Sequence, residues 1–155
     1  MRKAMLLLAV FGLIGSLWAA DQMGTWKLNI AKSKLPPSAA NLKEIIMVFR
    51  EIDANTIEGS STQTTQDGKT TTGKWTTPKN GGIQTYQEGT PAAGTSTLAV
   101  VVDPDTIYNV TLQNGRQVQL TPINFSKDGR TFTVTYKGND PQGKPYEFVV
   151  LFEKQ

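Results

Sequence analysis

The chain has neither cysteine nor histidine among its 155 residues. Without cysteine there are no disulfide bonds, so the fold must be held by its own core. Without histidine there is no histidine-ligated haem, no ordinary zinc site and no Ser-His or Cys-His nucleophile. We therefore expect no metal and no cofactor, and the commonest classes of cofactor enzyme are excluded.

The chain also lacks a large excess of either sign of charge, and its charged residues do not form clusters. The chain has 16 Lys and Arg against 13 Asp and Glu. Two of the basic residues, Arg2 and Lys3, precede the hydrophobic N-terminal run, and without them 14 basic residues nearly balance the acidic ones. A nucleic-acid surface needs a basic stripe that displaces counterions. Nucleic acid is therefore not an expected partner.

The single long apolar run covers residues 5–17, after a basic head and before Ala19 and Ala20. This order is typical of a secretory signal peptide, and the run is shorter than the roughly 20 residues that span a bilayer. We predict a signal peptide at residues 1–20, cleaved after Ala19 or Ala20; an uncleaved anchor is the alternative. The mature chain would be secreted or periplasmic, with no stable membrane anchor.

Residues 21–155 show the pattern of short strands joined by turns, in one domain. In residues 23–30, Trp26 and Leu28 alternate with polar residues, and Phe132, Val134 and Tyr136 alternate strictly with threonines. Tight-turn sequences recur between such stretches, for example at residues 66–69 and 114–115. About ten strands without long helices predict an antiparallel up-and-down meander. Closing it into a barrel would remove the exposed sheet edges.

Two stretches are open to more than one interpretation. Residues 43–52 are apolar on both faces, which fits a strand or an amphipathic helix; their β-branched content favours the strand. Residues 56–77 contain nine threonines and only two large apolar residues, Ile57 and Trp75. This stretch predicts either a solvent-washed hairpin or a pair of strands whose Thr and Gln side chains line a wet cavity.

Three segments resemble small exported bacterial proteins of the lipocalin-like (calycin) group. They are Gly24-Thr25-Trp26-Lys27-Leu28-Asn29 with the Ala-Lys-Ser-Lys that follows, residues 126–135, and residues 137–146. The resemblance covers essentially the whole of residues 21–155. It implies an all-β, eight- to ten-stranded calycin barrel in which Gly24 and Trp26 form a structural plug, with Trp26 packed across the closed end.

The chain also departs from the better-known members of that group. It lacks the Thr-Asp-Tyr stretch of lipocalins. An arginine near the last strand commonly covers the tryptophan in that group, but only Lys154 is near the end here, and Arg130 and Arg116 are further back. Residues 31–42, interrupted by Pro36-Pro37, leave no room for the helix-turn-helix lid of fatty-acid-binding barrels. The carboxylate-binding Arg-x-Tyr of those barrels is absent too. Fatty-acid binding is therefore not carried over.

The acidic residues are poorly spaced for catalysis. Glu147 and Glu153 share a face of one predicted strand, but six residues put them about 20 Å apart, beyond any glycosidase pair. Asp103-Pro104-Asp105 has the composition of a turn. We therefore expect a protein that is not an enzyme. An enzyme that works without His or Cys is a third, less favoured class.

We expect the barrel to bind a small hydrophobic or amphipathic ligand. Trp75 and Tyr86 are the candidate pocket residues, and Arg50 and Gln119 the candidate orienting groups, because a mostly apolar pocket uses few polar anchors. These choices depend on which strand faces point inward. The alternative is an envelope or extracellular barrel that binds another protein and has a filled interior. In either case a monomer is favoured.

Overall fold

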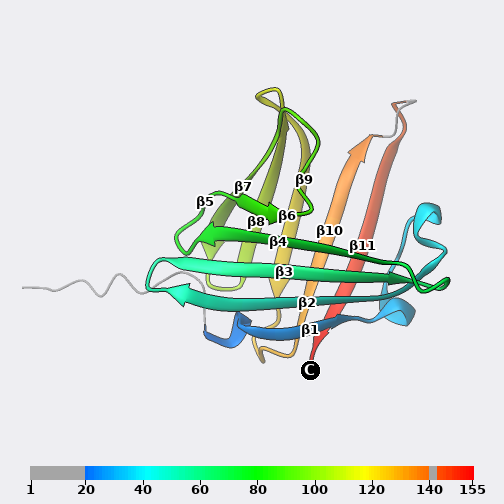
Figure 1. Ribbon diagram of the computed structural model, residues 1–155, viewed down its shortest axis with the longest axis horizontal. Helices are drawn as coiled ribbons and strands as arrows, with labels where there is room; N and C mark the ends of the chain where they lie inside the picture. The colour runs from blue at the N-terminus through cyan, green and yellow to red at the C-terminus, as the bar shows by residue number, and fades with distance from the viewer. Residues whose placement is uncertain (1–19, 140–142) are drawn as a thin grey trace, which may run out of the picture.

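Residues on both sides of Gln84 bring the two ends of one sheet together. In the computed structural model, which describes residues 20–139 and 143–155, all eleven described strands belong to one antiparallel sheet, rolled into a nearly closed barrel (Figure 1). The strands are β1 (Gly24–Leu28), β2 (Leu42–Asp53), β3 (Thr56–Thr65), β4 (Thr70–Pro78), β5 (Gly82–Ile83), β6 (Thr85–Glu88), β7 (Thr95–Asp103), β8 (Thr106–Gln113), β9 (Arg116–Phe125), β10 (Thr131–Asn139) and β11 (Pro145–Lys154).

The order of strands confirms the all-β, antiparallel meander. Along the sheet it is β5-β7-β8-β9-β10-β11-β1-β2-β3-β4-β6, so most neighbours follow each other in the chain. Strand β1 joins the first and last long strands, since Trp26 is paired with Met47 of β2 and with Lys154 of β11. Figure 1 shows β1 to β4 crossing in front of the steeper β7 to β11.

The predicted count of eight to ten strands is wrong, because residues 83–88 form two strands. Ile83 of β5 pairs with Leu98 of β7, whereas Tyr86 of β6 pairs with Trp75 of β4. Between them the Gln84 N–H donates to the Thr97 carbonyl at 2.9 Å. The chain therefore steps from one edge of the sheet to the other within a single residue. β5 and β6 are both short because each pairs with a different strand.

Both stretches that the sequence left open to two interpretations are strands. Residues 43–52 lie in β2, which excludes the helical alternative, and Phe49 of this strand is buried while Met47 packs against the core. Residues 56–77 form the β3–β4 hairpin, in which Ile57 and Thr77 are fully buried and the turn is exposed. The threonine-rich hairpin thus belongs to the barrel wall, with one face toward the interior.

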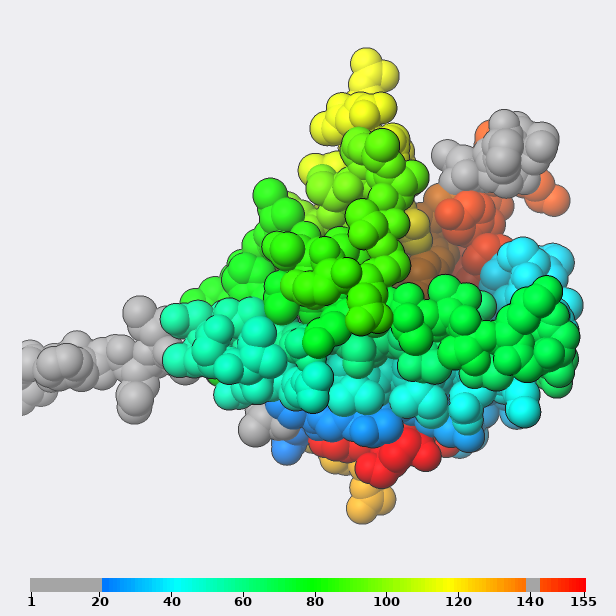
Figure 2. Space-filling view, viewed as in Figure 1, coloured from blue at the N-terminus to red at the C-terminus, as the bar shows by residue number. Residues whose placement is uncertain are grey.

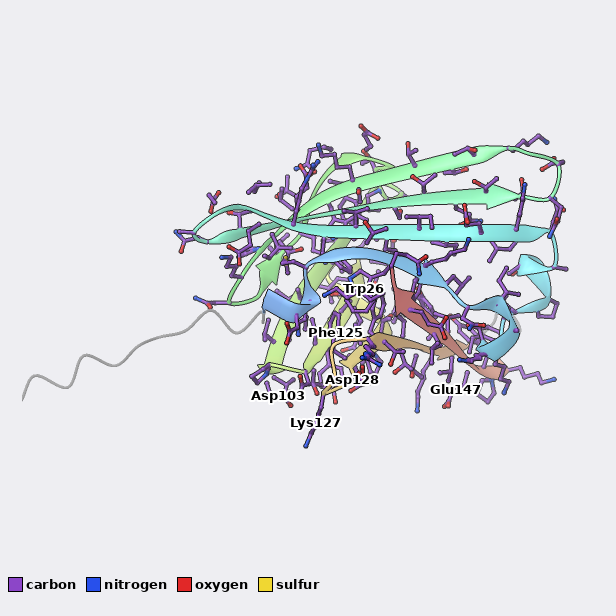
Figure 3. The ribbon with its side chains drawn as sticks, turned by 90° about the horizontal axis from the view of Figure 1, so that it is seen from below. Trp26, Asp103, Phe125, Lys127, Asp128 and Glu147 are labelled. Carbon is purple, nitrogen blue, oxygen red and sulfur yellow. The ribbon has the colours of Figure 1, made fainter. Side chains whose placement is uncertain are left out.

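Aromatic rings fill one end of the barrel around Trp26. This side chain has no exposed surface, and its ring meets Phe132 and Phe125 edge to face at 5.0 and 5.8 Å between centroids. Phe132 in turn stacks on Phe152 at 4.7 Å. The indole N–H of Trp26 donates to the Gln22 carbonyl at 3.1 Å, so its one polar group is paired. Figure 3 shows Trp26 and Phe125 close together under β1.

At the other side of the barrel, β1 is too short to fill the space between β11 and β2. It pairs with β11 only through residues 26–28 and with β2 only through residues 24–27. Beyond Leu28 the gap is covered by residues 29–41, which we call the linker. The linker contains two single helical turns, η2 (Ile30–Lys32) and η3 (Pro37–Ala39). A further turn, η1 (Ala20–Gln22), lies outside the linker and precedes β1.

The predicted signal peptide, residues 1–20, lies outside the described residues except for Ala20. Within the part of the chain that the structure describes, no helix is long and apolar enough to cross a bilayer.

Candidate ligand-binding pockets

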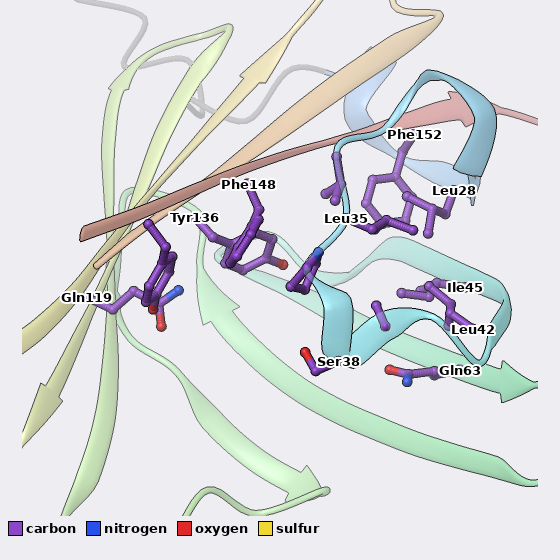
Figure 4. Close-up of a pocket in the computed structure, with 14 residues that line it drawn as sticks. Leu28, Leu35, Ser38, Leu42, Ile45, Gln63, Gln119, Tyr136, Phe148 and Phe152 are labelled. Carbon is purple, nitrogen blue, oxygen red and sulfur yellow. The ribbon is translucent and has the colours of Figure 1, made fainter. Parts of the chain in front are cut away.

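Beneath the linker lies a pocket of about 420 Å³, which we call the linker pocket (Figure 4). The linker forms one wall, β10 and β11 form another, and β2 and β3 complete it. Its lining is mostly apolar with a few uncharged polar groups: Leu28, Leu35, Pro36, Ser38, Ala39, Leu42, Ile45, Gln63, Gln119, Tyr136, Tyr146, Phe148, Val150 and Phe152.

Strand alternation supplies the aromatic wall of the linker pocket. Tyr146, Phe148, Val150 and Phe152 stand at every second position of β11 and therefore share its inner face. The Tyr146 and Phe148 rings stack at 5.1 Å between centroids. Tyr136 approaches from β10, directly opposite Phe148 in the strand register. This face gives the pocket a continuous apolar surface.

Hydrogen bonds to β11 hold the first half of the linker in place. Asn29 caps η2, because its Oδ1 accepts from the Lys32 N–H at 3.0 Å. The Ser33 hydroxyl accepts from the Leu151 N–H at 2.9 Å and donates to the Asn29 carbonyl at 2.6 Å. The Lys34 N–H then donates to the Val149 carbonyl at 2.7 Å. The segment that follows is thereby directed over the pocket, where Leu35 and Ala39 pack against the core.

The second half of the linker is held by the β3–β4 turn. The Gln66 N–H donates to the Asn41 carbonyl at 2.8 Å, and the Gln66 side chain donates to the Leu42 carbonyl at 3.2 Å. Figure 2 shows the linker beside this turn at one edge of the molecule. The cover of the pocket is therefore tied to two parts of the barrel that are distant in sequence.

A second pocket, of about 240 Å³, occupies the middle of the barrel, and we call it the central pocket. Gln119 and Tyr136 line both pockets, so the two adjoin. A further space of about 40 Å³ continues toward Ile107 and Phe125. The central pocket is lined by Met47, Phe49, Trp75, Gln84, Tyr86, Thr97, Asn109, Thr111, Gln119, Thr121, Ile123, Phe132, Val134 and Tyr136.

The rings of Trp75 and Tyr86 form a side of the central pocket near the closure of the sheet. Their centroids are 6.4 Å apart, and Trp75 also meets Phe49 edge to face at 6.5 Å. The Tyr86 hydroxyl lies 3.1 Å from both Gln84 Oε1 and Thr97 Oγ1, so it is fixed from β7 as well as from its own segment. These contacts position Trp75 next to the pocket.

Three of the four predicted ligand-binding residues line the pockets. Trp75 and Tyr86 line the central pocket, and Gln119 lines both. Arg50 lines neither pocket. Since Phe49 faces the interior, the next residue faces outward, and the Arg50 guanidinium lies 2.5 Å from Glu58 with 63% of its side chain exposed.

The predicted plug residues line neither pocket, although both lie next to residues that line the central pocket. Gly24 pairs with Phe49 at the start of β1, and Trp26 packs among the phenylalanine rings described above. Several residues that line the pockets were not singled out from the sequence, among them Asn109, Tyr136 and Leu35 of the linker. For Tyr136 the sequence held a signal, because the strict alternation around it places it on the same strand face as Phe132 and Val134.

The described residues that line the two pockets carry no charge. Burial raises the pKa of the Tyr136 phenol. The residue as a whole is 37% accessible, and it lines both pockets. With this raised pKa, the phenol stays neutral at physiological pH. Among the described residues, no three acidic side chains gather closely enough to hold a metal ion.

The acidic residues considered above as catalytic candidates take part in ion pairs and turns. Glu147 pairs with Lys137 at 2.9 Å, and Glu153 pairs with Lys32 at 2.9 Å. The Lys32 hydrogen bond lowers the pKa of Glu153. Asp103 Oδ1 accepts from the Asp105 N–H at 2.8 Å within the β7–β8 turn. Figure 3 shows Asp103 and Glu147 well apart.

Fold and pockets together define the class of protein: a nearly closed antiparallel β-barrel whose interior is partly open and mostly apolar. Comparison of the sequence with protein-family models and with curated proteins finds no match.

Proposed function

We propose that this chain is an exported lipocalin-like barrel that binds a small hydrophobic or amphipathic molecule in its interior. The observation that carries the proposal is the linker pocket. Its volume of about 420 Å³ falls within the roughly 300–1,000 Å³ of small-molecule sites, which are mostly apolar with a few polar groups. A role in binding rather than catalysis fits the position of the paired carboxylates outside the pockets.

Two further features support the calycin type and the exported location. The meander begins with a Gly-x-Trp strand, and its tryptophan packs at one end of the barrel, with the Lys154 side chain of the last strand over its ring. The apolar run of residues 5–17, with its basic head, supports export to the periplasm or the exterior. We expect the protein to act there as a monomer.

The competing function is a protein-binding barrel, and it rests on an interior filled by side chains. The linker pocket and the central pocket leave room inside the barrel, which favours the small ligand.

Native mass spectrometry of the protein purified from its own host tests the proposal. We expect a co-purifying mass of a few hundred daltons, the size that such pockets enclose. Thermal denaturation with a panel of alcohols, lipids and isoprenoids is the second measurement. A ligand at 100 times its Kd stabilises the fold by about 2.7 kcal/mol.

A variant that fills the linker pocket tests whether the ligand binds there, and a variant on the outer surface is its control. Ala39→Phe places a ring in the space beside Leu42 and Ile45 and should abolish the thermal shift. Ile83→Phe, at a position with 66% exposure on the outside of the barrel, should leave the shift intact. A protein without co-purifying mass that no member of the panel stabilises would contradict the proposal and favour the protein-binding barrel.

A further inference from the structure

The inner face of β7, β8 and β9 carries uncharged polar side chains in two adjacent rows. Thr97 pairs with Thr111, and Thr111 with Gln119, in the first row. Asn109 pairs with Thr121 in the second. All five side chains line the central pocket, and we call them the polar wall.

The opposite side of the central pocket is apolar. Met47 and Phe49 of β2 and Trp75 of β4 come from strands across the barrel, and Phe132 and Val134 of β10 add apolar surface beside β9. A molecule in this pocket is therefore contacted by carbon surface on one side and by hydroxyl and amide groups on the other. Such a site selects a molecule with one polar edge.

Asn109 gives the polar wall an unsatisfied group. Its Oδ1 is buried and has no hydrogen-bond partner among the described residues. Buried polar atoms are nearly always paired, and leaving one unpaired is unfavourable. A hydroxyl both donates and accepts, so a ligand hydroxyl satisfies the Asn109 amide whichever of its atoms faces the ligand. A carboxylate only accepts, and an ammonium only donates.

No charged side chain of the described lining is available to neutralise an ion in either pocket. An ion transferred from water to such a site loses its hydration without gaining a counter-charge. The uncharged ring of Tyr136, which lines both pockets, adds no charge at neutral pH.

From these observations we infer that the ligand is a neutral amphipathic molecule whose hydroxyl or amide group contacts the polar wall and whose apolar part extends into the linker pocket. The inference rests on the proposed function and narrows it to one class of ligand. It separates this barrel from sites that hold fatty-acid anions through a basic side chain.

Titration calorimetry of the protein with decanol, decanoate and decylamine at pH 7 tests the inference. The three probes share one chain length and differ in head-group charge. Decanol should bind, and both ions should bind about 100-fold more weakly. The reason is that burying an ion without a counter-charge is strongly unfavourable. Decanoate or decylamine binding as tightly as decanol would overturn the inference while leaving the proposed function intact. Failure of all three to bind would contradict both.

Variants of the polar wall provide the second arm. Asn109→Leu combined with Thr121→Val removes two polar groups and should weaken decanol binding roughly tenfold or more. The thermal midpoint of the unliganded variant should stay the same or rise, because an unpaired buried amide is removed. Thr135→Val, on the outer face of β10, is the matched control and should leave decanol binding unchanged. Equal decanol affinity in the wild type and the double variant would overturn the role of the polar wall.

Discussion

The ammonium group of Lys154 lies over the ring of Trp26, with 5.2 Å between Nζ and the ring centroid. The same Nζ donates to the Asp21 carbonyl at 2.7 Å. Gly24 makes this approach possible, because a Cβ at its position would come within 3.2 Å of Lys154 Cε, and its φ of +124° suits glycine. The end of the last strand thus covers the first strand.

Replacing Lys154 with methionine should lower the free energy of unfolding by about 1 kcal/mol, since cation–π contacts at partly exposed sites contribute about 0.5–1 kcal/mol. Lys154→Arg should retain most of the stability, because a guanidinium can also lie over the indole. Urea denaturation of the two variants measures the difference. Equal stability of the methionine variant and the wild type would show that the cation contributes nothing.

Trp26→Ala should destabilise the barrel by about 3–5 kcal/mol, the range for truncation of a buried large aromatic side chain. The side chain has no exposed surface and contacts β9 and β10 through phenylalanine rings, β11 through Lys154 and η1 through Gln22. Ile83→Ala, at a position with 66% exposure, is the control and should change stability by less than about 0.5 kcal/mol. An unaltered melting temperature in the tryptophan variant would contradict its place in the core.

Gly59 has to be glycine because Trp75 lies against it. A Cβ at Gly59 would come within 2.5 Å of Cε2 of the Trp75 ring. Gly59→Ala should therefore displace Trp75 and destabilise the fold by about 1–3 kcal/mol, as overpacking does. The emission maximum of Trp75, measured in a background that carries Trp18→Phe and Trp26→Phe, reports the displacement. Ser60→Ala, one position along the strand, should leave the emission unchanged.

Stability in acid should depend on Glu58. Hydrogen bonds from Lys74 and then Arg50 lower the pKa of Glu58 from its ordinary value of 4.5. Because the folded state favours the ionised carboxylate, these contacts stabilise the fold above pH 4.5, and the stabilisation is lost as the pH falls toward the lowered pKa.

The change that tests this is Glu58→Gln, with the free energy of unfolding measured across the acid range. The variant should lose less stability than the wild type below pH 4.5. The effect should be modest and should shrink in about 1 M salt, because Arg50 is largely exposed and salt screens such pairs. Parallel pH profiles for variant and wild type would contradict the assignment.

Local chemistry explains why much of the meander is predictable from the sequence. Asn114 and Gly115 adopt φ values of +50° and +77°, which few other residues tolerate, so the β8–β9 turn is marked by its residue types. Strict alternation places Phe132 and Tyr136 on the same face of β10, and both line the central pocket.

The features that the sequence does not reveal depend on contacts between distant residues. The break at Gln84 follows from the meeting of two sheet edges, which no local pattern encodes. Pro36-Pro37 indicates an extended connector but not that Leu35 and Ala39 beside it cover a pocket. Arg50 was assigned to the wrong face because β2 is apolar on both faces, so periodicity does not set its orientation.

A crystal structure of the protein after incubation with decanol tests the central claim most directly. We predict electron density for one molecule that contacts Gln119 and Tyr136, the residues shared by both pockets, with its hydroxyl against Asn109. An interior without ligand density, or decanol only on the outer surface of the barrel, would contradict the account.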